Sequence, residues 1–122
     1  FLYDLKHMDS AKHKSFTGVP NELILENARR LAAAGGKLQV RVPVIPKLNG
    51  GMENIRATAA FCKELGDAVT LVQVLPYHRM GIAKYERLDL PYRLVNVDPP
   101  EDEYLNARLQ VMLDAGLKAQ LH

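Results

Sequence analysis

The 122-residue chain lacks several features that would assign it to a class at once. It has one cysteine, Cys62, so no internal disulfide can form, and we expect a reducing, cytoplasmic setting. No apolar run is long enough to cross a membrane. The formal net charge of +2 is too small to indicate a nucleic-acid partner. The P-loop, GxGxxG and HExxH motifs are also absent.

What the chain does contain is an alternation of apolar runs and amphipathic stretches. Short apolar runs, bounded by turn residues, predict strands over residues 1–5, 37–46, 68–76 and 117–122. Strands that alternate with helices are typical of an α/β fold with a parallel sheet. Because the first residues already have the pattern of a strand, we interpret the chain as part of a larger α/β sheet or barrel.

Helical periodicity and capping residues predict four helices, over residues 9–18, 20–36, 52–65 and 98–116. For the first, either Asp9 or Ser10 is a suitable N-cap. For the last, we expect Asp98 to be the N-cap, Pro99 the first helical residue and Glu101 the closing residue of a capping box. Residues 77–97 have no regular pattern, and a loop of this length is usually functional or poorly ordered. Cys62 lies on an apolar helical stripe and is expected to pack in the core.

Charged residues follow or interrupt the predicted strands. Asp4 and Lys6 are two residues apart, so in a strand they share a face at its carboxyl end, where active sites of α/β proteins gather. From the pattern alone, a surface salt bridge at the strand exit is the slightly favoured interpretation. Arg41 lies within a run of valines and needs a partner, because an uncompensated buried charge is costly. It forms either a structural ion pair, for example with Asp4, or part of a polar site.

Together, several motifs resemble a known family. These are "YDLKHMDSAKHKSFTGVPNELILENARR", "LQVRVPVIPKLNGGMENI" and "LVQVLPYHRMG", in this order. They resemble the C-terminal half of the glycyl-radical-enzyme activating enzymes, which are radical S-adenosylmethionine (SAM) proteins related to the pyruvate formate-lyase activating enzyme. The resemblance implies a partial (β/α) barrel of the TIM type, with parallel strands and covering helices.

The resemblance also implies a SAM site. Asp4 matches the residue that binds the SAM ribose and helps to hold a monovalent cation, and Lys6 matches the residue that binds the methionyl carboxylate. Arg41 matches a basic residue of the SAM-facing strand, His78 a histidine near ribose and adenine, and Leu75 an apolar adenine contact. Pro43 stands where a contacting valine occurs in other members. Apart from that monovalent cation, no residue of this chain is expected to bind metal, and none is expected to be catalytic.

The family's activity needs groups that this chain does not supply. A reduced [4Fe-4S] cluster cleaves SAM to a 5′-deoxyadenosyl radical, which abstracts hydrogen from a glycine of the partner glycyl radical enzyme. The CxxxCxxC motif that holds the cluster and the "GGE" stretch that contacts the SAM amine are absent. We therefore expect residues 1–122 to be the C-terminal part of the barrel, without the cluster-binding half, and to be inactive alone.

The resemblance implies partners, and rival interpretations stay open beside it. Besides the glycyl radical enzyme, we expect an electron donor such as flavodoxin or ferredoxin, no nucleic acid, no membrane, and dimerisation through the open sheet as one option. One rival is another radical SAM enzyme with a different substrate. The other is a non-enzymatic α/β binding module.

Overall fold

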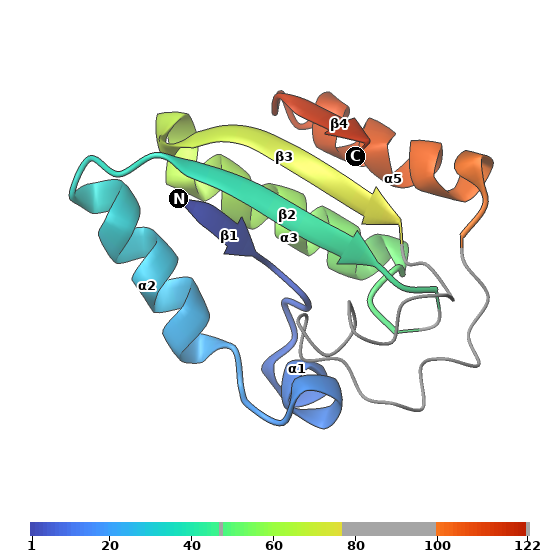
Figure 1. Cartoon of the computed structure of the whole chain (residues 1–122), viewed down its shortest axis with the longest axis horizontal. Coiled ribbons are helices and arrows are strands. Elements are labelled where there is room, and N and C mark those ends of the chain that lie inside the picture. The colour runs from blue at the N-terminus through green and yellow to red at the C-terminus, as the bar shows by residue number, and fades with distance from the viewer. Residues whose placement is uncertain (47, 77–99, 122) are drawn as a thin grey trace.

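The computed structural model describes residues 1–46, 48–76 and 100–121, and Figure 1 shows how their helices and strands are arranged. Its elements alternate along the chain as the sequence predicts. In order they are β1 (Leu2–Asp4), α1 (Ser10–Thr17), α2 (Glu22–Ala33), β2 (Leu38–Val44), α3 (Met52–Leu65), a 3-10 turn (Gly66–Ala68), β3 (Val69–Pro76), α5 (Asp102–Asp114) and β4 (Ala119–Leu121). The predicted irregular loop over 77–97 lies outside the described residues.

The strands of the described residues form one parallel sheet in the order β1-β2-β3-β4. Each strand is therefore hydrogen-bonded to the next strand of the chain, with a helical crossover between them. All the carboxyl ends point the same way (Figure 1). The prediction of an α/β fold with parallel strands and covering helices is confirmed, and the arrangement is that of a partial TIM-like barrel.

One face of the sheet packs against helices and forms the core. Figure 1 shows α3 and α5 on the same side of the sheet, with α2 alongside β1. The side chains that β2 and β3 direct to this side are buried together with apolar residues of the two helices: Leu38, Val40, Val42, Val44, Val72, Val74, Ile55, Ala59, Leu105 and Met112. Because side chains alternate along a strand, the intervening residues must face the other side.

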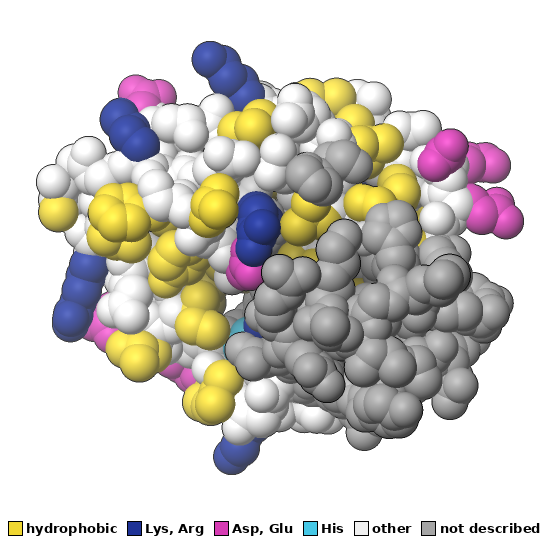
Figure 2. All heavy atoms as spheres, viewed as in Figure 1, with side chains coloured by type: hydrophobic (Ala, Val, Ile, Leu, Met, Phe, Trp, Pro, Cys, Tyr) yellow, Lys and Arg dark blue, Asp and Glu magenta, His cyan; other side chains and the backbone are white. Residues whose placement is uncertain are grey.

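The opposite face carries a polar row that crosses the whole described sheet. In the strand register Asp4 pairs with Arg41, Arg41 with Gln73, and Gln73 with Gln120. None of these four side chains is fully buried. Figure 2 views the molecule from this face, where hydrophobic side chains are interspersed with charged ones. The sheet is thus apolar toward the helices and mixed on its other face.

The two N-terminal helices begin at polar residues, although not always at the expected one. In α1 the Asp9 carboxylate accepts a hydrogen bond from the backbone N–H of Lys12 at 3.0 Å, so Asp9 is the cap rather than Ser10. Gly18, with φ of 90°, ends this helix as predicted. In α2 the N-cap is Asn21, one residue beyond Pro20, so the proline precedes the helix instead of opening it.

The predicted start of α5 is wrong. The helix begins at Asp102 with Glu101 as the N-cap, and the Glu101 side chain makes no capping hydrogen bond. Asp98 and Pro99 lie outside the described residues. The physical reason is the Pro99-Pro100 pair, since a residue that precedes proline is disfavoured in the helical conformation. Pro100 and Glu101 are described and are not helical, so the capping-box pattern predicted a start that is too early.

Cys62 is confirmed as a core residue of α3. Its side chain is fully buried, and burial raises the pKa of its thiol to about 12. A thiol with this pKa stays protonated at neutral pH, whereas metal ligation and nucleophilic attack need the thiolate. None of the helices in the described residues is long and apolar enough to span a membrane.

Candidate functional site

A pocket with both polar and apolar walls lies along β1 and the residues that follow it. Its volume is about 320 Å³. Residues of β1, β2 and the first two helices line it: Leu2, Tyr3, Asp4, Lys6, His13, Ile24 and Arg41. Three of the five predicted site residues, Asp4, Lys6 and Arg41, thus line one pocket.

Asp4 and Arg41 form a two-point ion pair across neighbouring strands. Arg41 Nε donates to Asp4 Oδ1 at 2.7 Å and Arg41 Nη2 donates to Asp4 Oδ2 at 3.2 Å. The side chain of Arg41 is 34% exposed and that of Asp4 is 26% exposed, so the pair is half-buried. Its hydrogen bond raises the pKa of Arg41 further above its ordinary value. The expected partner of Arg41 is confirmed, and the pair places a fixed carboxylate and guanidinium on the pocket wall.

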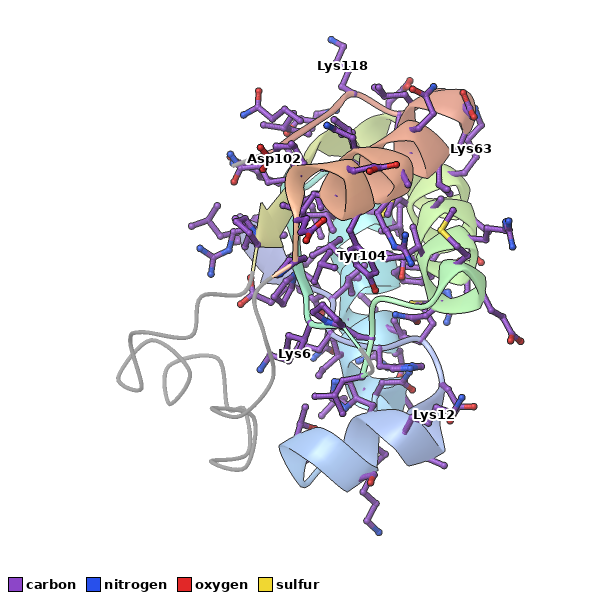
Figure 3. The ribbon with its side chains drawn as sticks, turned by 90° about the vertical axis from the view of Figure 1, so that its right-hand side faces the viewer. Lys6, Lys12, Lys63, Asp102, Tyr104 and Lys118 are labelled. Carbon is purple, nitrogen blue, oxygen red and sulfur yellow. The ribbon has the colours of Figure 1, made fainter. Side chains whose placement is uncertain are left out.

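Lys6 lies just beyond the end of β1, after the buried Leu5. In Figure 3 the sheet is seen nearly edge-on; Lys6 lies on the side away from α3, whereas Lys12 of α1 lies on the other side. Lys6 is partly exposed and Lys12 is exposed. An ammonium group, a carboxylate and a guanidinium in one pocket suit a ligand that carries both hydroxyl groups and a carboxylate.

The two other predicted site residues are not brought into this pocket by the described structure. Leu75 is near the carboxyl end of β3, where it pairs in register with Pro43 of β2. This position is on the same face as Arg41, two residues further along the strands. His78 lies outside the described residues.

Three buried asparagines that the motif analysis missed hold the loop that carries Lys6. Asn49 donates to the carbonyl of Lys6 at 2.8 Å, and Asn21 donates to the carbonyls of His7 at 3.0 Å and Met8 at 2.8 Å. Asn54 accepts from the N–H of Met8 at 2.9 Å. All three side chains are buried. The available signal was weak: each asparagine lies close to a predicted helix start, a position where asparagine is common for capping alone.

The two described histidines are fixed by backbone contacts. His13 Nδ1 donates to the carbonyl of Val19 at 2.6 Å, and His7 Nδ1 accepts from the N–H of Asp9 at 3.0 Å. Within the described residues, no three His, Cys, Asp or Glu side chains are grouped so as to hold a metal ion.

The burial of His7 predicts a pH-dependent stability. Burial, and then the charge of Lys12, lower the pKa of His7 below its ordinary 6.5. The unfolded chain therefore binds a proton at a pH where the folded chain does not, so the free energy of unfolding falls as pH drops below 6.5. We expect His7→Asn to remove this component. Denaturant unfolding between pH 5 and about 7.5 measures it, and identical pH profiles for variant and wild type would contradict the assignment.

Fold and pocket together define a class: a parallel α/β protein with charged side chains gathered in a pocket beside its first strand. Solved structures share this fold. A domain of the pyruvate-formate lyase-activating enzyme of Bacteroides vulgatus superposes with a TM-score of 0.81 and 35% identity, over 99% of this chain and 65% of that one. A radical SAM methyltransferase of Sphaerobacter thermophilus has a TM-score of 0.71 over 99% of this chain and 33% of its own, at 16% identity, which shows the fold alone.

Curated relatives of this chain are activating enzymes. The (2S)-3-sulfopropanediol dehydratase activating enzyme of Klebsiella oxytoca is 44% identical over 97 residues, which are 79% of this chain and 31% of the relative. Further relatives with 35% and 49% identity are also activating enzymes. No family model matches the chain. The chain is a homologue of the glycyl-radical-enzyme activating enzymes, of the radical SAM kind, and it spans about a third of the length of these curated relatives.

Proposed function

We propose that this chain supplies part of the SAM pocket of a radical SAM activase, which generates a glycyl radical on a partner enzyme. The single observation that carries the proposal is the convergence of Asp4, Lys6 and Arg41 on one pocket in a chain homologous to activating enzymes. The Asp4 carboxylate accepts hydrogen bonds from the ribose hydroxyls of SAM, and the Lys6 ammonium pairs with its methionyl carboxylate.

Arg41, Leu75 and His78 complete the proposed pocket. Arg41 holds Asp4 in place through two hydrogen bonds, so that the carboxylate oxygens keep one orientation. Leu75 provides an apolar contact for adenine from the same face of the sheet, two residues beyond the level of Arg41. His78 is proposed to contact the ribose and adenine, on the sequence resemblance alone.

The described residues do not fit an iron-sulfur cluster. They contain no group of three His, Cys, Asp or Glu side chains that could hold a metal ion together. The thiol of Cys62 is buried and protonated. We propose that residues 1–122 are the C-terminal part of the barrel, that cluster ligands come from outside this sequence, and that the chain alone is inactive. The expected electron donor, a flavodoxin or ferredoxin, and dimerisation through the open sheet stay predictions.

The proposal is tested with the protein that joins this chain to a cluster-binding segment, reconstituted anaerobically with iron and sulfide and then reduced. We expect 5′-deoxyadenosine to accumulate from SAM, and a glycyl-radical EPR signal to appear only when a matching glycyl radical enzyme is added. Formation of 5′-deoxyadenosine with small molecules but with no glycyl radical enzyme would favour a different radical SAM substrate. Absence of SAM binding would favour a non-enzymatic binding module.

A further inference from the structure

The hydrogen-bond ladder between β1 and β2 stops just before Lys6, and a proline explains why. The N–H of Gln39 donates to the backbone carbonyl of Phe1 at 2.8 Å, and the N–H of Leu5 donates to the backbone carbonyl of Arg41 at 2.9 Å. Both bonds belong to a regular parallel ladder. The next donor from β2 to the carbonyl of Leu5 would be the N–H of residue 43. Residue 43 is proline, which has no N–H. Beyond Leu5 the backbone therefore needs partners from outside the sheet.

Asn49 takes over where the ladder stops. Its carboxamide nitrogen donates to the carbonyl of Lys6 at 2.8 Å and also to the carbonyl of Pro43, while its oxygen accepts from the N–H of Ile45 at 2.7 Å. The side chain is only 1% exposed. One carboxamide thus joins the exit of β1 to the exit of β2, and all its donors are used.

Two further carboxamides extend this support over the next residues. Asn54 donates to the carbonyl of Asn49 at 2.9 Å and accepts from Met8, and Asn21 donates to the carbonyls of His7 and Met8. We name Asn21, Asn49 and Asn54 the asparagine cradle. They come from the start of α2, the loop after β2 and the first turn of α3. Consecutive backbone groups of residues 6–8 are thus held by three different parts of the chain.

We propose that Asn49 is a positioning residue for ligand binding, which acts through the backbone of Lys6. This inference rests on the proposed function, because it assigns Lys6 to the carboxylate of SAM. A lysine side chain has four rotatable bonds, so its ammonium reaches a fixed carboxylate at low entropic cost only if its backbone is held. Asn49 supplies that anchor where Pro43 lacks the N–H that would continue the ladder.

The test compares two ligands that share a nucleoside. SAM carries the methionyl carboxylate, whereas 5′-methylthioadenosine lacks it. In the complete, cluster-loaded protein, Asn49→Ala is expected to raise the dissociation constant for SAM by roughly tenfold. The dissociation constant for methylthioadenosine should change less than about twofold, because the nucleoside is proposed to bind Asp4 rather than Lys6. Anaerobic calorimetry measures both, and Asn106→Ala, which removes an exposed carboxamide from α5, is the matched control.

The outcomes separate this inference from the proposed function. An equal loss for both ligands, or no loss for either, overturns the role of Asn49 while the proposed function stands. A wild-type protein that binds no SAM overturns both. If Asn49→Ala does not fold, Asn54→Ala replaces it, since that change frees the Asn49 carbonyl and the Met8 N–H, and the same selective loss is expected.

Discussion

Replacing Lys6 with methionine is expected to weaken SAM binding more than any other single change at the site. Methionine keeps the apolar stem and most of the length of the side chain but removes the ammonium group. The SAM carboxylate then loses its cationic partner within a pocket walled by protein, an expected loss of roughly 3 kcal/mol, or about a hundredfold in the dissociation constant. Anaerobic calorimetry on the complete, cluster-loaded protein measures the change, and 5′-methylthioadenosine should bind the variant as tightly as the wild type.

Lys12→Met is the matched control for this prediction. Lys12 is exposed on α1 and lies on the other side of the sheet from Lys6 (Figure 3). The substitution removes the same charge from the molecule, so it reports any long-range electrostatic effect on an anionic ligand group. If Lys12→Met weakened SAM binding as much as Lys6→Met, the effect would be one of net charge and the role of Lys6 would be refuted.

The largest effect on stability is expected at Leu38. This residue of β2 is fully buried on the face that packs against the helices. Truncation to alanine leaves a cavity in the layer between sheet and helices, because the rigid strands on both sides relax only partly. The expected cost is about 2–5 kcal/mol, a large share of the roughly 5–15 kcal/mol that holds a typical domain folded. Denaturant unfolding of the chain measures the loss.

Leu23→Ala tests whether this loss comes from burial. Leu23 lies on α2 and its side chain is 65% exposed, so its truncation should change the free energy of unfolding by less than about 0.5 kcal/mol. Similar losses for the two leucines would mean that the core is not on the helix-covered face. The assignment of the opposite face to ligand binding would then fail as well.

Much of the fold was predictable because it depends on local patterns. The alternation of valines in β2 correctly places Arg41 on the opposite face from Val40 and Val42, and one side of α3 was correctly assigned to the core from its apolar spacing. The prediction of where α5 starts was wrong because two local rules compete there. A capping-box pattern favours a helix from Asp98, whereas a residue that precedes proline is disfavoured in the helical conformation.

The site was predictable only in part, for a related reason. Strand periodicity and the need of Arg41 for a counter-charge lead to Asp4, and the structure confirms that pair. The asparagine cradle depends instead on contacts between residues far apart in the sequence: Asn49 is 43 residues from Lys6, and Asn54 is 46 residues from Met8. A buried asparagine has no sequence pattern of its own, so its partners are known only once the sheet and helices are in place.

A crystal structure of the cluster-loaded protein with SAM tests most directly whether this pocket holds the nucleoside and the carboxylate. We expect Lys6 Nζ to lie about 2.7–3.2 Å from the methionyl carboxylate, and Asp4 oxygens to lie at a similar distance from the ribose hydroxyls. Arg41 should still donate to Asp4. SAM bound elsewhere in the barrel, with Asp4, Lys6 and Arg41 in contact only with each other or with water, would contradict the proposed pocket.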